Sequence, residues 1–176
     1  LQKDRERKMI TVKINGEERQ YPQGATYEDV TNDYQQEYEN LIALAARDGK
    51  IRELFKKLTR DCEVTFFTLK DDVGNKTYVR SATMLFLKAV FDVYGREAAQ
   101  ICRVEFAIGN GSYISPKEKI NATEENAAKI RNRMRELVEA KTPFLKRSYS
   151  LDNAMELFRK EGMKDKEKLF RYRRGS

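Results

Sequence analysis

The chain has 176 residues, of which 40% are hydrophobic and 36% charged, a composition typical of a folded protein with room for one ordinary domain or two small ones. Its longest apolar stretch, residues 82–93, is interrupted by Lys88 and Asp92 and is too short to span a bilayer, and its two cysteines form no CxxC pair. Composition therefore excludes a membrane partner and a disulfide framework, and it predicts a reduced, cytoplasmic setting.

The net charge of +7 is spread unevenly along the chain. Residues 1–8 carry a net +2, residues 9–70 a net −2, residues 71–158 a net +2 and residues 159–176 a net +5. A basic tail of this kind can steer anionic partners such as RNA or a nucleotide toward the protein. Short charged runs also occur in proteins that bind no anion, so the tail alone leaves both interpretations open.

The first part of the chain predicts a hairpin followed by a helix. Residues 10–14 alternate apolar and polar side chains, as a half-buried strand does. The Asn15-Gly16 pair then favours a tight turn, because both positions of such a turn need a positive φ, and it leads to a return strand over 17–21. Thr26 can cap a helix that ends before Leu41.

A second hairpin is indicated by Asp48-Gly49, between residues 41–46 and 50–54, although residues 41–47 alone could also form a helix. Residues 61–69 alternate again and predict a central strand. Strand, hairpin, helix, hairpin and strand in this order form a small β-grasp pattern. Residues 71–75 contain two aspartates, a glycine and an asparagine, and they indicate a break between two units.

The second unit is predicted to begin with a buried, nearly all-apolar helix over residues 81–94 that Gly95 ends. A strand over 102–108 turns at Asn110-Gly111 into residues 112–115. Two further helices are predicted to follow. Thr123 caps the first, whose apolar face carries Ile130, Met134, Leu137 and Val138 and which ends at Pro143; Ser150 caps the second, which Gly162 stops.

Residues 9 to about 70 resemble a TGS domain, the ubiquitin-like β-grasp module of threonyl-tRNA synthetases and certain GTPases. The order and spacing of four segments carry this resemblance. They are Ile10-Thr-Val-Lys-Ile-Asn-Gly16, Gly24-Ala-Thr26, Asp48-Gly-Lys-Ile-Arg-Glu-Leu54 and Leu58-Thr-Arg-Asp-Cys-Glu-Val64.

The second unit resembles the second additional domain shared by threonyl- and alanyl-tRNA synthetases, which is their editing domain. Arg80-Ser-Ala-Thr-Met-Leu-Phe86 stands where that family has a His-Ser-Ala-Thr-His-Leu-Leu type motif. The other matching segments are Ala107-Ile-Gly-Asn-Gly-Ser-Tyr-Ile114, Ile130-Arg-Asn-Arg-Met-Arg-Glu-Leu137, Pro143-Phe144 and Ala154-Met-Glu-Leu-Phe158. We therefore expect an α+β protein with residues 1–8 as a flexible leader or an expression remnant, a β-grasp domain over 9–72, and an antiparallel sheet with helices over 73–176 that is incomplete at its carboxyl end.

The departures from the family decide what the resemblance implies. Arg80 and Met84 replace two helical histidines that help to bind a metal or to position the hydrolytic water in the family, and the whole sequence contains no histidine. The family's further Cys and His would lie beyond Ser176. A hydrolytic zinc site needs three protein ligands and an open position, so the resemblance implies no catalytic residues, no metal site and no cofactor.

The pairing of these two domains also resembles the amino-terminal region of bacterial uridine kinase-like proteins of the phosphoribulokinase family. In those proteins a kinase domain follows, and residues 169–174 resemble the run that leads toward it. The chain has no G-x-x-x-x-G-K-[ST] motif, and Gly109-Asn-Gly111 is too short to replace one. The resemblance thus implies a kinase domain as a partner in the same polypeptide, with no enzymatic activity in this chain.

Candidate contacts follow from these comparisons. Arg80 could hold a phosphate or carboxylate in a degenerate editing pocket, helped by Ser81, Thr83, Met84 and the helix amino-terminus; alternatively Arg80 is an exposed or ion-paired arginine and Met84 a core residue. Weaker candidates for RNA or other anionic contacts are Arg131, Arg135, Arg171, Tyr172, Arg173 and Arg174. These residues could equally form a solvated helix face and an inter-domain strand or tail.

Three functions remain open at this point. The first is a ligand-binding or regulatory module ahead of a kinase-like domain, which senses RNA, a nucleotide or an aminoacyl-type ligand, or which holds domains together. The second is a free-standing hydrolase of mischarged tRNA, for which Glu105 is the nearest candidate base. The third is a general RNA-binding module, favoured if the basic tail folds against Arg131 and Arg135.

Overall fold

The computed structural model describes residues 8–109, 111–116 and 120–172, and the chain divides into two compact units at the Thr83–Met84 bond. The fold is α+β, as predicted, with strands and helices in both units. The expected leader, apart from Lys8, lies outside the described residues. The expected domain boundary between residues 72 and 73 stays a prediction.

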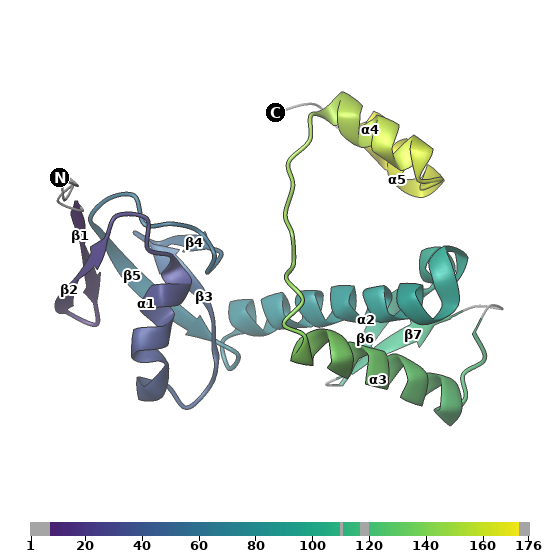
Figure 1. The fold of residues 1–176 in the computed structure, drawn as a ribbon, viewed down its shortest axis with the longest axis horizontal. Coiled ribbons are helices and arrows are strands. Elements are labelled where there is room, and N and C mark those ends of the chain that lie inside the picture. Colours follow the sequence, from purple (N-terminus) through teal and green to yellow (C-terminus); the bar gives the residue numbers. More distant parts are fainter. Residues whose placement is uncertain (1–7, 110, 117–119, 173–176) are drawn as a thin grey trace, which may run out of the picture. The chain divides into compact units, whose positions relative to one another are not determined.

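The first unit contains one mixed sheet and a helix. Its elements are β1 (Met9–Ile14), β2 (Glu17–Pro22), α1 (Tyr27–Tyr34), the short 3₁₀ helix η1 (Gln35–Glu37), β3 (Ile42–Arg47), β4 (Lys50–Arg52) and β5 (Cys62–Thr68). The strand order is β2-β1-β5-β3-β4, in which β1 and β5 are parallel and the other pairs antiparallel (Figure 1). Both predicted hairpins and the central position of β5 are therefore confirmed.

The core of this unit lies between α1 and the sheet. Ile10, Val12 and Ile14, the apolar positions of the alternating β1, are at most 1% exposed and pack with Tyr27 and Val30 of α1. Burial of such side chains stabilises each by about 1.5–3 kcal/mol relative to exposure. The alternation of β1 thus sets which sheet face receives the helix.

The predicted cap of α1 is confirmed as a capping box. The hydroxyl of Thr26 accepts a hydrogen bond from the backbone N–H of Asp29 at 3.1 Å, and the carboxylate of Asp29 accepts one from the backbone N–H of Thr26 at 2.7 Å. The two bonds satisfy donors that the first helical turn would otherwise leave unpaired.

Helix α2 (Asp72–Ile101) begins earlier than the sequence predicts. The carboxylate of Asp71 accepts a hydrogen bond from the N–H of Thr68 at 2.7 Å and closes the turn after β5. Gly74 then brings the first turn of α2 against that turn, because a Cβ at Gly74 would lie only 2.0 Å from the carbonyl oxygen of Thr68. Residues 72–75, expected to mark the break between two units, are therefore helical, and Gly74 allows a close approach between the start of α2 and the turn after β5.

The predicted stop at Gly95 is confirmed as an interruption, since Gly95 has φ 83° and ψ 179° inside α2. The second unit continues with β6 (Arg103–Ile108), β7 (Gly111–Ser115), α3 (Glu124–Glu139), α4 (Leu151–Lys160) and α5 (Lys164–Arg171). The two strands are antiparallel, as predicted, whereas Asn110 in their turn lies outside the described residues. Thr123 and Ser150 cap α3 and α4 as expected, and α5 is an additional helix.

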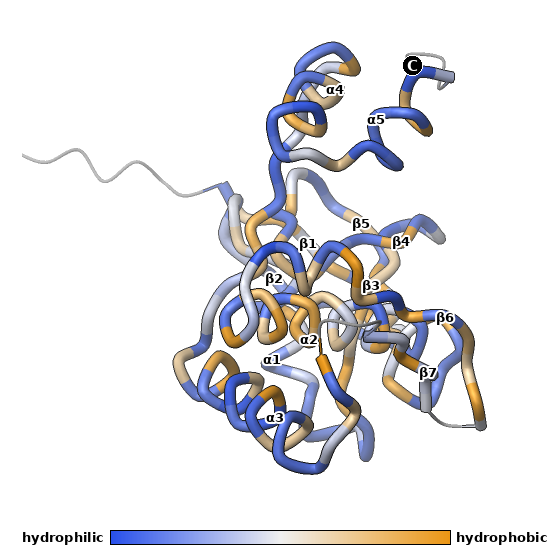
Figure 2. The backbone as a smooth tube through the Cα atoms, turned by 90° about the vertical axis from the view of Figure 1, so that its right-hand side faces the viewer, coloured by the Kyte–Doolittle hydropathy of each residue, from blue (hydrophilic) through white to orange (hydrophobic). Residues whose placement is uncertain are grey.

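The core of the second unit is small. Val90, Ala98, Cys102 and Ile120 are at most 7% exposed, and Ile114 and Ile130 pack against them. Helix α3 carries both hydrophilic and hydrophobic positions (Figure 2), and its Ile130 packs against this cluster. Val138, predicted on the same apolar face, is instead 62% exposed. The prediction that α2 is buried all round is wrong, since Phe91 is 42% exposed while Ala89 and Val90 are fully buried.

We expect replacement of Gly74 by alanine to destabilise the first unit. The added methyl group must displace the Thr68 carbonyl or shift the start of α2, and overpacking of this kind costs about 1–3 kcal/mol. Urea unfolding followed by circular dichroism measures the loss. The neighbouring exposed Asn75→Ala is the matched control and should change stability by less than about 0.5 kcal/mol. A Gly74→Ala protein as stable as the parent would contradict the close approach.

Candidate functional site

The candidate pocket residues on α2 lie inside the helix and not at its start. The hydroxyl of Ser81 donates a hydrogen bond to the carbonyl of Thr77 at 3.1 Å, and that of Thr83 donates to the carbonyl of Val79 at 2.9 Å. Because α2 begins about two turns before Arg80, the amides around Arg80 bond within the helix. The predicted anion site at a helix amino-terminus is therefore wrong, and the role of Arg80 as a ligand contact stays a prediction.

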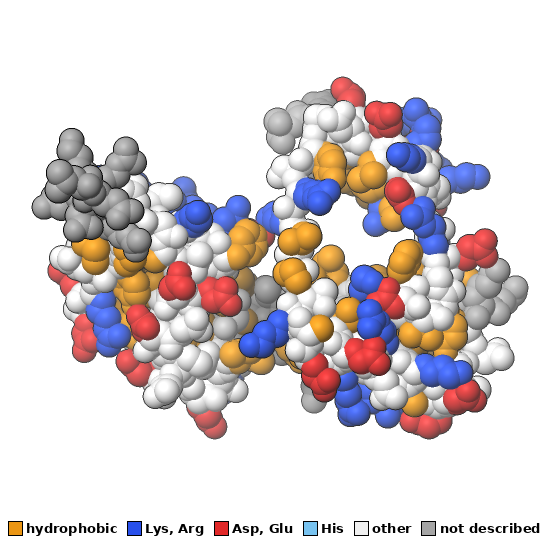
Figure 3. Space-filling model, viewed as in Figure 1, with side chains coloured by type: hydrophobic (Ala, Val, Ile, Leu, Met, Phe, Trp, Pro, Cys, Tyr) orange, Lys and Arg blue, Asp and Glu red, His pale blue; other side chains and the backbone are white. Residues whose placement is uncertain are grey.

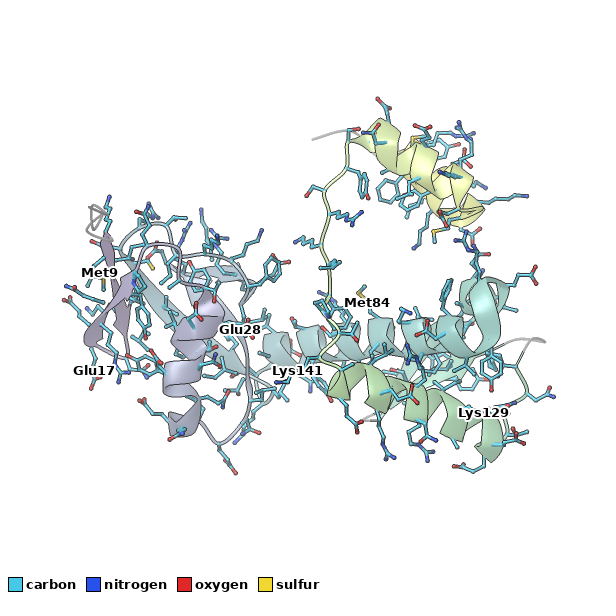
Figure 4. The ribbon with its side chains drawn as sticks, in the orientation of Figure 1. Met9, Glu17, Glu28, Met84, Lys129 and Lys141 are labelled. Atoms are coloured by element: carbon cyan, nitrogen blue, oxygen red, sulfur yellow. The ribbon has the colours of Figure 1, made fainter. Side chains whose placement is uncertain are left out.

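Met84 is exposed, although its apolar surroundings predict a core position. Its side chain is 60% exposed, and Arg80, one turn before it, is exposed as well (Figure 4). In the second unit α3 and the β6–β7 hairpin lie along one side of α2 (Figure 1), and Val90 of α2 packs in the cluster that includes Ile114 and Ile130. The interpretation of Met84 as a core residue is therefore wrong.

The basic residues of α3 are engaged by nearby carboxylates. Arg131 pairs with Glu124 at 3.1 Å and Lys129 with Glu125 at 2.7 Å. Arg135 is exposed, and no ion pair involves it within the described part of the chain. The candidate pair Arg131 and Arg135 therefore offers one uncompensated cation, which makes this helix face a weaker anion site than its composition predicts.

Arg133 links two helices. Its Nε lies 2.9 Å from a carboxylate oxygen of Asp92 on α2, and its Nη1 lies 2.8 Å from Glu136 on α3. Asp92 also accepts a hydrogen bond from Lys88. The hydrogen bond from Lys88 first, and that from Arg133 second, hold the pKa of Asp92 below its ordinary value of 3.8. This cluster fastens α3 to α2, so its cations serve structure.

The basic tail forms a helical hairpin. Phe158 of α4 and Phe170 of α5 meet edge to face with ring centroids 5.0 Å apart. Arg171 is the last residue of α5, so the expectation of an inter-domain strand is wrong for Arg171, because Phe170 beside it gains a hydrophobic partner by helix formation. Arg171 lies 3.9 Å from Glu167.

Tyr172 is 78% exposed, and Arg173 and Arg174 lie outside the described residues. The hairpin is tied to the end of α2 by an ion pair of 2.6 Å between Arg96 and Glu161 and to β6 by one of 3.6 Å between Arg103 and Asp165. Among the described residues no hydrogen bond or ion pair joins it to Arg131 or Arg135, so the observed bonds of the tail do not favour a general RNA-binding module.

Two cavities of about 510 and 540 Å³ lie in the second unit, and Cys102 lines both. The first lies between α2 and the α4–α5 turn and includes Leu87 and Phe91. The second lies between β7 and α3 and includes Phe86 and Ile130. Neither of these two is lined by Arg80, Ser81, Thr83 or Met84.

The described residues present little chemistry for hydrolysis. Across them, no group of three or more His, Cys, Asp or Glu side chains is arranged to hold a metal ion. Burial raises the pKa of Cys102 and of Cys62, which keeps both thiols protonated and weakly nucleophilic at neutral pH. Glu105 lies at an irregularity in the β6–β7 register and is exposed. The expected absence of catalytic residues, metal and cofactor stays a prediction.

A basic surface of the first unit escaped the sequence analysis. Lys50 and Arg52 lie on β4, and Phe55, Lys56 and Lys57 follow in the adjoining turn. Figure 3 shows Lys and Arg side chains gathered along the edge of this unit near β4. Summing charge over all of residues 9–70 gives −2 and conceals the cluster; counting in shorter windows would have found it.

Comparison with known proteins adds one class of relative. No known family model matches the chain. It is similar to threonine–tRNA ligases, with 27% identity to that of Thermotoga maritima over 88% of this chain and 24% of the relative. The ligase of Rhizobium etli is 27% identical over 84% of this chain and 22% of the relative. That of Maricaulis maris is 27% identical over 93% of this chain and 25% of the relative.

The chain thus spans about a quarter of the length of the curated relatives it matches. The matched region extends through both units and supports a module related to tRNA synthetases. None of the helices in the described residues is both long and apolar enough to cross a membrane.

We expect Asp92→Ala to lower the free energy of unfolding by about 1 kcal/mol, because Arg133 and Lys88 lose a shared acceptor whose side chain is only 17% exposed. Glu125→Ala is the control: the Glu125 side chain, which pairs with Lys129, is 77% exposed, so its loss should destabilise the protein clearly less than the loss of Asp92. Urea unfolding at neutral pH compares the two.

The effect of Asp92 should depend on pH. Its folded pKa is lowered, so its contribution is complete above about 3.8 and disappears as the pH falls through the folded value. The difference between the parent and Asp92→Ala should therefore shrink in acid. A difference that grows below that value would contradict the ion-pair arrangement.

Proposed function

We propose that this chain is a non-catalytic recognition module that binds RNA of the tRNA class. The observation that carries the proposal is its similarity, over 84–93% of its length, to threonine–tRNA ligases, whose name specifies tRNA as a substrate. The net charge of +7 favours a polyanionic partner. The exposed Arg80, Arg135 and Tyr172 are available for such a partner.

The proposal that the module does not hydrolyse its ligand rests on side-chain chemistry. Activation of water needs a positioned base or a metal-bound hydroxide. The sequence contains no imidazole, and the raised pKa values of both thiols make them poor nucleophiles. A role as a free-standing editing hydrolase is therefore the least supported alternative.

The second candidate is a ligand-binding or regulatory module at the amino-terminal side of a kinase domain, in a cytoplasmic bacterial protein. Its support is the resemblance to the amino-terminal region of uridine kinase-like proteins described above. In that arrangement the exposed α2 face with Arg80 and Met84 would contact a nucleotide or an aminoacyl-type ligand.

The RNA proposal predicts that the purified chain binds tRNA with an affinity that falls steeply with salt. Each phosphate contact contributes about 0.7–0.9 to the slope of log K against log salt, so three to five contacts predict a slope between about −2 and −4.5. Fluorescence anisotropy with labelled tRNA at two salt concentrations measures it. No affinity at low salt would refute the proposal.

The non-catalytic assignment predicts no release of amino acid from mischarged tRNAs in the same preparation, with or without a chelator. Turnover that the chelator abolishes would overturn it.

The kinase arrangement predicts a phosphate-binding loop of the form G-x-x-x-x-G-K-[ST] downstream in the full reading frame. A reading frame that continues as a synthetase would exclude that candidate.

A further inference from the structure

The first unit is electrically polarised. Residues 47–60 carry a net +4, whereas the remaining residues of 9–70 carry a net −6. Lys50, Lys56 and Lys57 are exposed, and within the described residues no ion pair involves them. On α3, in contrast, Lys129 and Arg131 pair with carboxylates, and in the tail Arg159 pairs with Glu167, whereas Lys160, Lys164 and Lys168 are exposed. Within the first unit, the charge available to an external anion is therefore concentrated at β4 and the turn after it.

We propose that this chain binds single-stranded RNA at its β4 surface, which is formed by Lys50, Arg52, Phe55, Lys56 and Lys57. The inference rests on the proposed RNA-binding function and assigns it a place. Lysines and an arginine neutralise phosphates. Phe55 is 51% exposed and offers a ring on which a base can stack.

Phe55 and Lys56 already form the kind of contact that the proposal requires. The ammonium of Lys56 lies over the ring of Phe55, 5.3 Å from its centroid. Each base of a single strand lies next to a phosphate, just as the ring of Phe55 lies next to the ammonium of Lys56. A base stacked on the free side of this ring would therefore place its phosphate near a cation. Adjacent aromatic and basic residues thus match the repeating chemistry of a single strand.

The turn that carries these side chains is held by backbone hydrogen bonds. The N–H of Tyr27 donates to the carbonyl of Lys56 at 3.0 Å, and the N–H of Glu28 donates to that of Leu54 at 2.8 Å. The N–H of Leu58 donates to the carbonyl of Ala25 at 2.7 Å. Helix α1 therefore presents the turn as a fixed surface, which reduces the ordering cost of binding.

Edge position leaves the surface accessible. β4 is the last strand of the sheet order and spans only three residues, so its outer side has no neighbouring strand in the described unit. The carboxylates of Glu28 and Glu53 lie in the adjoining segments and limit the number of phosphates that the surface can neutralise. We therefore expect about two to three phosphate contacts here.

The test uses the full chain and a labelled single-stranded RNA of about 12 nucleotides. In one variant Lys50, Lys56 and Lys57 are all replaced by glutamine; in its control Lys160, Lys164 and Lys168 are replaced, which removes the same charge from the tail. The β4 variant should bind at least about ten times more weakly, with a salt slope reduced by about 2, and the tail variant should stay within about threefold of the parent.

A second substitution tests stacking without altering charge. Phe55→Leu should weaken binding to the RNA by about three- to tenfold and leave the salt slope unchanged, because it removes the ring and keeps the cations. Since Phe55 is half exposed, the protein should retain its thermal unfolding profile.

The outcomes separate the site from the function. If the parent binds RNA and the β4 and tail variants lose affinity equally, the site is wrong and the proposed function survives. If the parent binds tRNA but not the short single strand, the site is wrong and the proposed function survives; if it binds neither, both are wrong. If polyglutamate competes as well as RNA and Phe55→Leu has no effect, the surface recognises acidic chains in general, and the assignment to RNA is overturned.

Discussion

Helix α2 starts where it does because Gly74 has no side chain. The space within 2.0 Å of the Thr68 carbonyl admits a hydrogen atom and excludes a methyl group, so the helix can begin directly after the last strand of the first unit. This early start decides the character of the candidate pocket motif. It places Arg80 and Ser81 inside a hydrogen-bonded helix, where no free amide is left to hold an anion. A helix that began at residue 81 would have left free backbone N–H groups beside Arg80 and Ser81, and these could have bound an anion.

Competition between internal and external anions determines which basic residues can act in recognition. On α3, carboxylates four and seven positions away pair with Lys129 and Arg131, and in the tail Glu167, eight positions away, pairs with Arg159. An RNA phosphate would have to displace these carboxylates, so each such contact would contribute less to the free energy of RNA binding. At β4 the lysines face solvent, so the same charge is worth more to a ligand. Recognition thus depends on local charge balance rather than on the number of cations.

Local signals in the sequence predicted the elements that backbone sterics control. The positive φ of Asn15 and of Asp48 and the caps by Thr26, Thr123 and Ser150 depend on residues next to one another, and all were confirmed. Errors arose where distant residues decide. Helix α5 depends on the meeting of Phe158 with Phe170, and the exposure of Met84 depends on which side of α2 is covered.

The sequence by itself determined the α+β class, the order of strands and helices apart from α5, and the absence of imidazole, because composition, alternation and turn residues are local properties of the chain. Tertiary structure alone decided where α2 begins, which cations are already paired, and that Lys50, Lys56 and Phe55 form one fixed surface. Their physical basis is packing distance and charge pairing in three dimensions, as in the hydrogen bonds from Tyr27 and Glu28 that hold the turn after β4, and a pattern of residue types does not show these distances.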